Sequence, residues 1–546
     1  MGKEISGGIL LKKPLKKIIT YDVGTTGLKT CLFSFGDELT LLASEMVGYD
    51  LYILDNGGAE QEPNQWWDAM CATTQKLLEK TSTAPEDVAG VSFCSQGQGL
   101  VLVDMAGRPL RRMMSYMDQR ACSEMQEVMS RGLKISGINL FKLLLSIRET
   151  GVVAASVKDP VWKYKWVERN EPDVFKKIYK WLDVKEFLIC KCTDKFIMTE
   201  DSAFATLLYS IRKGKEGWSK TVCKLLGVNR DHLPPIIKST DQAGTITPEA
   251  ASLLGLQVGT PVFGGGVDAS LIGIGAGSVL IGDTHIYAGT SGWVSTVIDK
   301  PVLDISSMIA SIVGVQPGKY NYFAELETAG KCLEWVKDHL ALDEIGVYLE
   351  GTLIHESQET VYTSLYEYLT SIIEKVKPGS GGVIFTPWLH GNRCPFEDPA
   401  ARGMFFNIGL ETGKSELIRA VIEGVCFHLR WMLEAQEKKV RTSDSIRFVG
   451  GGALSKVTCQ ILADVLQRKI ETVENPQNVG AVGSAVVTAI GLGSFDSFEA
   501  ARQLIPVAIT FTPNRGNKSI YDRHYQVFKN LYRDNKKSFN ELNSCK

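Results

Sequence analysis

Several features that would assign a function class are missing from this chain of 546 residues. No apolar run approaches the length of a membrane span, and the amino terminus lacks the apolar core of a secretion signal. The 12 cysteines include no Cys-x-x-Cys pair and the 7 histidines are dispersed, which argues against zinc and favours reduced thiols. A net charge of −2 gives no electrostatic reason to expect a nucleic acid or a membrane surface as partner. We therefore expect a cytoplasmic globular protein.

A complete Walker A motif is also absent. Residues 409–415 read Gly-Leu-Glu-Thr-Gly-Lys-Ser, but Ile408 stands where the first glycine of that motif belongs. We interpret this stretch as a loop in which Ser415 caps an amphipathic helix over residues 416–434. A phosphate site, if the chain has one, must lie elsewhere.

One short sequence motif occurs twice in the chain. Residues 21–27 read Tyr-Asp-Val-Gly-Thr-Thr-Gly and residues 287–292 read Tyr-Ala-Gly-Thr-Ser-Gly, so the turns lie 265 positions apart (24 to 289). Such a turn presents N–H groups and hydroxyls toward one point, as a phosphate requires. Two copies predict a duplicated fold that holds one polyphosphate from both sides. Strand-forming residues flank the first copy, which predicts a β-hairpin and not a P-loop followed by a helix.

Only the first copy carries an aspartate, Asp22, at the end of an apolar strand. A carboxylate there would be poorly solvated without a cation or ligand, so Asp22 is a candidate to hold Mg²⁺ through water. Lys29 could reach phosphate oxygens, although an exposed strand lysine is the alternative. The glycines could equally serve only the positive backbone angles of a hairpin.

Two further glycine-rich stretches follow predicted strands. Residues 264–266 are glycines that leave space for a substrate before Asp268, and a carboxylate there can accept a hydroxyl proton during phosphoryl transfer. Asp268 is our candidate catalytic base, with a helix cap as the alternative. Residues 450–453 (Gly-Gly-Gly-Ala) suit close approach of a nucleotide, although tight strand–helix packing also selects glycine.

The length of the chain predicts two large domains. We expect a lysine-rich lead-in over residues 1–15, a first domain over 16–282, a second domain over 283–493, and a helical tail packed on the second domain over 494–546. Residues 1–6 also fit the loose N-myristoylation pattern, but a solvated lead-in is the favoured interpretation. The predicted elements include a strand at 88–95 and helices at 66–78, 455–467 and 480–492.

These stretches together resemble the FGGY family of carbohydrate kinases, within the superfamily of actin, sugar kinases and heat-shock chaperone ATPases. The resemblance covers roughly residues 17–535. It rests on the Asp22 hairpin and on residues 59–67, 160–170, 264–268, 402–406 and 450–465. Lys158 falls outside the residue set of the family's first signature, and the second signature, near residues 409–410, is two residues short.

The resemblance implies an α/β fold with two ribonuclease-H-like domains, of the actin/hexokinase ATPase type, around a central cleft. It implies that sugar binds mainly to the first domain, that ATP and Mg²⁺ bind mainly to the second, and that Asp268 is the catalytic base. The phosphate- and ATP-binding candidates are Gly24, Thr25, Thr26, Lys29, Gly289, Thr290, Ser291, Gly330, Gly451, Gly452, Ala453 and Lys456.

The departures from the family pattern fall on the sugar side. Xylulokinases, the most similar subgroup, carry Gly-Gln-Met-His-Gly where residues 95–99 here read Ser-Gln-Gly-Gln-Gly, a form closer to kinases of L-xylulose or erythritol. The usual Trp-Asn-Asp is Tyr-Met-Asp at 116–118, the usual Gly-Glu-Arg is Gly-Asn-Arg at 391–393, and Ala269 replaces an amide. Our substrate-binding candidates are Gln96, Gly97, Gln98, Tyr116, Asp118 and Asp268.

We therefore expect ATP-dependent transfer of the γ-phosphate to a hydroxyl of a ketopentose such as xylulose. Another acceptor (L-xylulose, ribulose, erythritol or glycerol) stays open, as does the choice between a monomer and a homodimer. A non-catalytic sugar or nucleotide sensor and a filament- or chaperone-type ATPase are the rival functions. The presence of Asp22, Asp268 and both turns favours the kinase.

Overall fold

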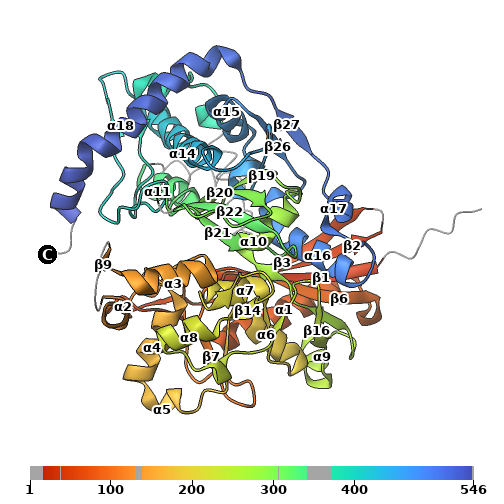
Figure 1. Ribbon diagram of the computed structural model, residues 1–546. Helices are drawn as coiled ribbons and strands as arrows, with labels where there is room; N and C mark the ends of the chain where they lie inside the picture. Colours follow the sequence, from red (N-terminus) through yellow and green to blue (C-terminus); the bar gives the residue numbers. More distant parts are fainter. Residues whose placement is uncertain are drawn as a thin grey trace, which may run out of the picture.

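The computed structural model describes residues 16–36, 38–130, 134–135, 138–304, 306–340 and 371–543. The predicted lead-in over residues 1–15 lies outside these ranges. The chain forms two lobes, one above the other in Figure 1, and each lobe is built around a seven-stranded sheet. No helix within the described ranges is long and apolar enough to cross a membrane.

The first sheet has the strand order β16-β17-β6-β1-β2-β3, with β18 also paired to β6. Its strands are β1 (Lys16–Val23), β2 (Gly27–Phe35), β3 (Leu39–Gly48), β6 (Val88–Ser95), β16 (Gln242–Thr245), β17 (Pro261–Phe263) and β18 (Gly266–Val267). The first three form an antiparallel meander, while β6 runs parallel to β1, and β18 parallel to β6. Parallel strands end at the same edge, so the residues that follow β1, β6 and β18 come together there.

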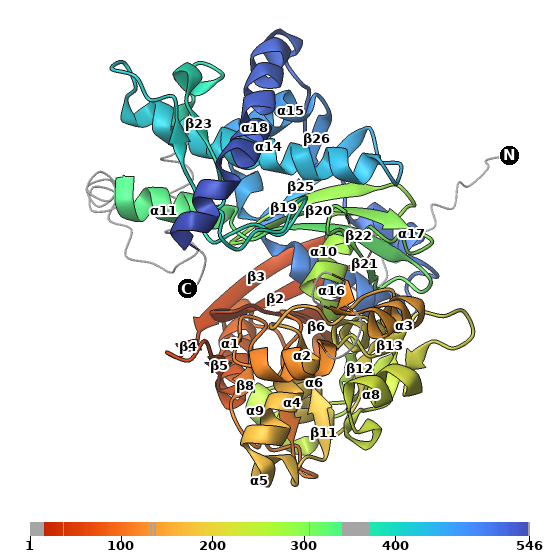
Figure 2. The same cartoon turned by 60° about the vertical axis from the view of Figure 1, so that its left-hand side comes forward.

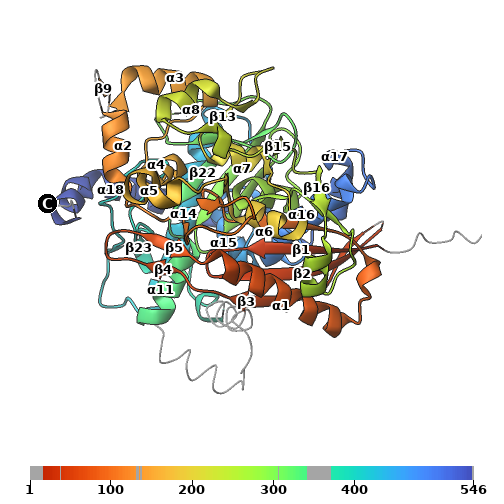
Figure 3. The same cartoon turned by 90° about the horizontal axis from the view of Figure 1, so that it is seen from below.

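Helices cover both faces of this sheet, as the alternation of side chains along β1 requires. Ile19 and Tyr21 pack in one cluster with Trp66 of α1 (Pro63–Thr81), which lies along the sheet in Figure 3. Ile18 packs on the other face with Ala481 of α16 (Val479–Gly491). The sheet is therefore buried on both sides.

The second sheet repeats the arrangement, with the order β21-β22-β20-β19-β25-β26-β27. Its strands are β19 (Thr284–Ala288), β20 (Gly292–Ile298), β21 (Ala310–Val313), β22 (Tyr320–Leu326), β25 (Ser445–Val449), β26 (Lys469–Thr472) and β27 (Ile509–Phe511). A meander β19-β20-β22 is followed by β25 and β26, which continue the sheet in parallel from β19. The duplication that the repeated turn predicted is confirmed.

Two helices lie between the lobes in Figures 1 and 2: α16 and α10 (Asp268–Gly275). They pack against each other. Helix α16 comes late in the chain yet packs on β1, β2 and β6 of the first sheet. Helix α10 comes before β19 yet places Gly273 against His285 of that strand. Each half of the chain therefore contributes a helix to the junction of the two sheets.

The remaining elements decorate the lobes. The other first-lobe helices are α2 (Cys122–Met129), α3 (Leu140–Thr150), α4 (Pro160–Asn170), α5 (Pro172–Phe175), α6 (Val184–Thr193), α7 (Glu200–Ala205), α8 (Lys220–Leu226) and α9 (Pro248–Leu254). Those of the second lobe are α11 (Gly330–Leu340), α14 (Lys414–Glu437), α15 (Lys456–Leu466), α17 (Phe498–Ala501) and α18 (Lys518–Asn543).

Short strands pair outside the two main sheets. They are β4 (Tyr52–Ile53), β5 (Ala59–Gln61), β7 (Val101–Val103), β8 (Met113–Met114), β9 (Lys134–Ile135), β10 (Ile138–Asn139), β11 (Lys180–Leu182), β12 (Met198–Thr199), β13 (Tyr209–Ser210), β14 (Gly217–Trp218), β15 (Ile236–Ile237), β23 (Ile384–Phe385) and β24 (Phe405–Phe406). Of these, β5 matters most for the site, because Gln61 at its end faces the first turn.

The predicted start of the helix after residue 415 is wrong. Helix α14 begins at Lys414 with Gly413 at its N-cap, so Ser415 lies inside the first turn and caps nothing. The Glu416 carboxylate accepts the Gly413 N–H at 3.1 Å and so satisfies one of the free N–H groups at this end of the helix. Beyond residue 493, β27 joins the second sheet, and α18 packs on α14 and α15.

Candidate active site

The first turn closes the hairpin between β1 and β2. The Gly24 N–H donates to the Gly27 carbonyl at 2.9 Å. The hydroxyl of Tyr49, just after β3, donates to the carbonyls of Gly24 and, at 3.0 Å, of Gly27. Thr26 is exposed and Thr25 partly exposed. The Tyr49 hydroxyl therefore holds the carbonyl groups of the turn, while Thr25 and Thr26 keep contact with solvent.

Asp22 lies two residues before this turn, directly across the ladder from Lys29. Burial raises the pKa of Asp22, while the Lys29 charge and a hydrogen bond with the Cys94 thiol lower it. Gly480 of α16 lies against the carboxylate, since a Cβ there would be 3.1 Å from Asp22 Oδ2. Lys29 Nζ donates to Asn478 Oδ1 at 2.9 Å, across 449 positions of the sequence. The first turn thus meets the start of α16.

Asp268 stands at the end of β18, on the same edge of the sheet. The bend before it needs glycine, because Gly265 has a φ of +66° and a Cβ there would overlap a carbonyl oxygen of β6. Burial, together with the charges of Asp22 and Glu325, raises the pKa of Asp268 to about 7, although the hydrogen bond from the Ala269 N–H lowers it. A carboxyl group with a pKa near neutrality suits proton transfer.

Asp201 holds the segment that carries Asp268. Its carboxylate accepts the Val267 N–H and the Ser270 hydroxyl, each at 2.6 Å, and the Thr199 hydroxyl at 2.5 Å. Val267 is the N-cap residue of α10 and Asp268 is the first residue of the helix, and the Asp268 carboxylate accepts the Ala269 N–H at 2.6 Å. Asp268 therefore also satisfies one free N–H of the helix, as the helix-cap alternative expects. No sequence pattern pointed to Asp201, since the residues it joins are far apart in the chain.

The second turn differs from the first in length and in its flanking pair. Three residues separate the last paired residues of its hairpin, Ala288 and Gly292, whereas four separate Val23 and Leu28 in the first. The preceding pair is Tyr287 and Trp293, whose rings stack with centroids 4.0 Å apart. The first hairpin has Asp22 and Lys29 at that place. The charged pair of one turn is an aromatic pair in the other.

Backbone groups at the start of α11 hold the second turn. Gly330 donates to the Gly289 carbonyl at 2.7 Å, and the N–H groups of Ala329 and Lys331 each donate to the Thr290 carbonyl at 3.2 Å. A Cβ at Gly330 would overlap the Gly289 carbonyl oxygen, so this approach requires glycine. The predicted candidates Gly330, Gly289 and Thr290 therefore do come together.

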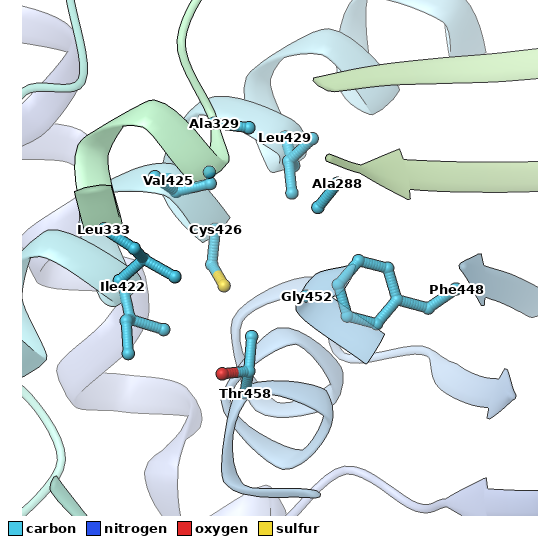
Figure 4. A pocket seen from close by; sticks show the side chains of 11 residues that line it. Ala288, Ala329, Leu333, Ile422, Val425, Cys426, Leu429, Phe448, Gly452 and Thr458 are labelled. Carbon is cyan, nitrogen blue, oxygen red and sulfur yellow. The ribbon is translucent and has the colours of Figure 1, made fainter. Parts of the chain in front are cut away.

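A pocket opens beside this turn (Figure 4). Phe448 lies across it from Leu333 and Ile422. Apart from the Thr458 hydroxyl and the Cys426 thiol, the lining side chains are apolar. Its lining residues are Ala288, Ala329, Gly330, Leu333, Ile422, Val425, Cys426, Leu429, Phe448, Gly452 and Thr458. Two predicted nucleotide positions, Gly330 and Gly452, thus line one apolar pocket, while Lys456 is exposed at the start of α15.

Buried side chains hold residues 96–99 in place after β6. Lys163 of α4 is fully buried and donates to the Gln98 carbonyl at 2.8 Å. The Asp183 carboxylate accepts the Gly99 N–H at 2.9 Å. Burial lowers the pKa of Lys163 to about 8 and raises that of Asp183 to about 7. Gln98 keeps the unusual φ of +61° and is partly exposed.

The other two sugar-side candidates differ in what they contact. The Tyr116 hydroxyl lies 3.3 Å from Thr25 Oγ1, so this side chain faces the first turn. Asp118 is fully buried beneath it, accepts the Ala59 N–H at 2.9 Å and pairs with Arg120 at 2.7 Å. Tyr116 is placed to meet a ligand, whereas the Asp118 carboxylate is occupied by the protein.

Charged side chains lie where the two lobes meet. Lys158, before α4, lies 3.9 Å from Glu327, after β22. Arg393 of the second lobe pairs with Glu325 at 3.1 Å. Its charge also lowers the pKa of Asp159, which burial raises to about 6. The residue that departs from the family's first signature, Lys158, is therefore one that bridges the lobes.

A metal site made of side chains alone is not found among the described residues, where no group of three or more potential ligands occurs. Magnesium does not need one, because it keeps several waters and binds proteins through one or two carboxylates together with substrate phosphates. A single partly buried carboxylate beside the first turn, Asp22, fits that requirement.

The sequence matches two protein-family models along most of its length. Residues 17–275 match the N-terminal domain of the FGGY family of carbohydrate kinases, and residues 285–492 match its C-terminal domain. Among curated proteins, the xylulose kinase of Staphylococcus epidermidis is 27% identical over 528 residues, 95% of this chain and 97% of that protein. The gluconokinase of Bacillus subtilis strain 168 is also 27% identical, over 94% of each chain.

Solved structures agree on the fold. The ligand-bound xylulose kinase from Lactobacillus acidophilus superposes with a TM-score of 0.82 at 24% identity and covers 97% of this chain and 100% of its own. The fold is thus the two-domain actin/hexokinase type, with ATP as the phosphate donor that this family of sugar phosphotransferases uses. The two matched domains, which span most of the chain, show that it belongs to the FGGY family of carbohydrate kinases.

Proposed function

We propose that this kinase phosphorylates a terminal hydroxyl of a ketopentose such as xylulose. The observation that carries the proposal is the placement of Asp268, whose pKa lies near 7, at the sheet edge shared by the first turn and residues 96–98. Full-length relatives named xylulose kinase and gluconokinase support a sugar or sugar acid of this size. Kinases of L-xylulose, ribulose, erythritol or glycerol would use the same arrangement.

In the proposed reaction the substrate hydroxyl gives its proton to Asp268 while its oxygen attacks the γ-phosphate in line, and the bond from the γ-phosphorus to the bridging oxygen breaks as ADP leaves. The N–H and hydroxyl groups of Thr25 and Thr26 would bind phosphate oxygens from one lobe, and those of Thr290 and Ser291 from the other. The N–H groups of Gly24 and Gly289 already donate within their own turns. Closure of the lobes over both ligands would exclude water and limit hydrolysis of ATP.

The remaining candidates divide between the two ligands. Asp22 would hold Mg²⁺ through water, and the bound ion would neutralise charge on the phosphates. The apolar pocket between Gly330 and Gly452 would take the nucleobase, with Gly451, Ala453 and Lys456 beside it.

On the sugar side we assign contact to Gln96, Gly97, Gln98 and Tyr116. Asp118 is covered by Arg120, so we assign it to supporting the loop below Tyr116. The loss of an imidazole and an amide relative to xylulokinases changes which hydroxyls find partners, and unmatched polar groups discriminate strongly between substrates.

An assay of ADP release with a panel of acceptors tests the proposal. D-xylulose, L-xylulose, D-ribulose, erythritol, glycerol and gluconate would each be supplied with ATP and Mg²⁺. We expect the highest kcat/KM with a ketopentose. If ADP release is highest with gluconate or a polyol, that compound replaces the ketopentose as the proposed substrate. ADP release without any acceptor would support an ATPase, and nucleotide binding without turnover on any acceptor would support a sensor.

A further inference from the structure

Two buried glutamines connect residues 96–98 to the first turn. Gln61, at the end of β5, donates from Nε2 to the Thr25 carbonyl at 2.6 Å. Gln96 donates from Nε2 to Gln61 Oε1 at 2.8 Å and to the Gly24 carbonyl at 3.1 Å. Gln61 is fully buried and Gln96 is 5% exposed. A continuous chain of hydrogen bonds therefore runs from the predicted sugar side to the backbone of the phosphate turn.

The orientation of both amides follows from their partners. The carbonyls of Gly24 and Thr25 can only accept, so the amide nitrogen of each glutamine must face the turn. Gln61 Oε1 is then free to accept from Gln96. The two amide hydrogens of Gln96 are thereby both used, one on Gln61 Oε1 and one on the Gly24 carbonyl. Reversing either amide would place two acceptors against each other.

One atom of this chain lacks a partner. Gln96 Oε1 is buried and accepts no hydrogen bond from any residue that the structure describes. A buried acceptor without a donor costs free energy, and such atoms in native proteins call for an explanation. The next residue, Gly97, packs against Val267, which precedes Asp268. A hydroxyl of a substrate near Asp268 is the kind of donor that would satisfy Gln96 Oε1, once the packing of Gly97 on Val267 opens to admit it.

We propose that Gln61 is a positioning residue that makes the first phosphate turn sensitive to sugar binding at Gln96. When a sugar hydroxyl donates to Gln96 Oε1, the Gln96 amide is fixed, Gln61 is fixed with it, and the Gly24 and Thr25 carbonyls are held in one place. The N–H groups of the turn then keep the orientation that the γ-phosphate needs. This role rests on the proposed function, because it requires the acceptor sugar to bind beside Gln96.

The second turn has a different support, in which the Tyr287 hydroxyl lies against Gly289. Its Gly289 and Thr290 carbonyls are held by backbone N–H groups of Gly330, Ala329 and Lys331, which do not respond to a change in a side chain. We therefore assign the coupling between sugar and nucleotide to the first turn.

Gln61→Met tests the proposal, because methionine keeps the length of the side chain but neither donates nor accepts strongly. The matched control is Gln75→Met, on the exposed side of α1, where Gln75 Nε2 donates to the Leu253 carbonyl at 2.7 Å. The measurement is the dissociation constant of D-xylulose, or of the best acceptor in the panel, with and without the non-hydrolysable nucleotide Mg-AMP-PNP. Thermal unfolding of each variant shows whether the fold is retained.

In the wild type and in Gln75→Met we expect the nucleotide to tighten sugar binding by about fivefold or more, a typical coupling between sites. In Gln61→Met we expect this factor to fall to within about twofold of unity. Each ligand alone should bind within about threefold of the wild type. Gln61→Met and Gln96→Met should also be strongly non-additive, because they interrupt one chain. Coupling in Gln61→Met equal to that of the control would overturn the proposal.

A second measurement does not depend on the sugar. Hydrogen exchange of residues 20–30 without ligand should be faster in Gln61→Met than in Gln75→Met, because the turn has lost a hydrogen bond. Unchanged exchange would show that Gln61 does not hold the turn and would also refute the inference. If the wild type neither phosphorylates nor binds any acceptor, the proposed function fails. The exchange measurement would still show whether Gln61 holds the turn.

Discussion

The two phosphate turns carry nearly the same sequence but are supported by different means. Side chains hold the first: Tyr49, Gln61 and Gln96 donate to its carbonyls. Backbone N–H groups at the start of α11 hold the second. A side-chain support can change with what binds to it, whereas a backbone support cannot. The comparison predicts an adjustable turn on the first lobe and a fixed one on the second lobe.

The residue pairs that flank the two turns also differ in chemistry. Asp22 and Lys29 precede the first turn, where a carboxylate can serve a cation. Tyr287 and Trp293 stack at the corresponding place before the second. A charged pair therefore flanks the turn where chemistry is proposed, and an aromatic pair flanks the other turn.

The largest expected effect tests whether the chemistry belongs to the first lobe. Asp268→Asn should lower kcat by about 10²- to 10⁴-fold, because the substrate hydroxyl loses its proton acceptor. Nucleotide affinity should stay close to the wild type, since Asp268 is assigned to the acceptor hydroxyl and not to the nucleotide. Steady-state kinetics and AMP-PNP binding check both, with the exposed Asp299→Asn as control. Near-normal turnover of Asp268→Asn would remove it from the mechanism.

The next prediction tests the rigidity of the second turn. Gly330→Ala should weaken nucleotide binding by about tenfold or more and lower the free energy of unfolding by about 1–3 kcal/mol, because its Cβ would displace the Gly289 carbonyl. Calorimetric titration with AMP-PNP and thermal unfolding measure these changes. Gly409→Ala is the control, because a Cβ there meets nothing within 4 Å among the described residues. Equal behaviour of the two variants would mean that the second turn adapts as readily as the first.

A smaller effect concerns pH. Burial and the charges of Asp22 and Glu325 raise the pKa of Asp268 to about 7, and a general base must be deprotonated to act. The value of kcat/KM should therefore level off above about pH 7 and fall about tenfold per unit below it. Glu325→Gln should move the midpoint to lower pH, because one charge that raises this pKa is removed. A profile that stays flat down to pH 5 would contradict the assignment.

The same pKa shift has a consequence for stability. A carboxyl group whose pKa is higher in the folded chain binds more protons there than in the unfolded chain between about pH 4 and 7. Stability should therefore fall as pH rises through this window, and Asp268→Asn should melt higher than the wild type at pH 8. The gain should be about 1–2 kcal/mol, because the side chain keeps some contact with solvent. Chemical denaturation at pH 5 and pH 8 measures it, and a loss of stability at pH 8 would contradict the burial argument.

The smallest expected effect tests the link between the lobes. Lys158 and Glu327 are partly exposed and 3.9 Å apart, so Lys158→Met should change kcat/KM by no more than about threefold. The difference from the wild type should disappear in high salt, because exposed charges are screened. Kinetics at two ionic strengths measure this. A larger, salt-independent loss would show that Lys158 serves the site itself.

Local patterns in the sequence predicted much of the fold. The strand at residues 88–95 and the helices near 66–78, 455–467 and 480–492 are close to β6, α1, α15 and α16. Such elements follow from periodicity, turn residues and glycine placement, which act over a few positions. The start of α14 was missed because Glu416 satisfies the helix end from within.

The parts of the site that escaped prediction are buried polar contacts between distant residues. Asp201 reaches Val267 across 66 positions, Lys163 reaches Gln98 across 65, and Gln61 reaches Thr25 across 36. Within its own segment, each of these residues looks like an ordinary polar residue. Gln61 and Lys163 lie inside stretches that resemble the family, but the neighbouring sequence does not indicate which distant residue each one contacts.

The sequence by itself determined the repeated turns, the two predicted domains and the aspartates at their strand ends, because these depend on residue types within short segments. The tertiary structure decided that α16 lies against Asp22, that Asp118 is covered, and that two glutamines join residues 96–98 to the first turn. The physical reason is that a buried hydrogen bond depends on where two distant segments meet. Only the packed sheets bring those segments together.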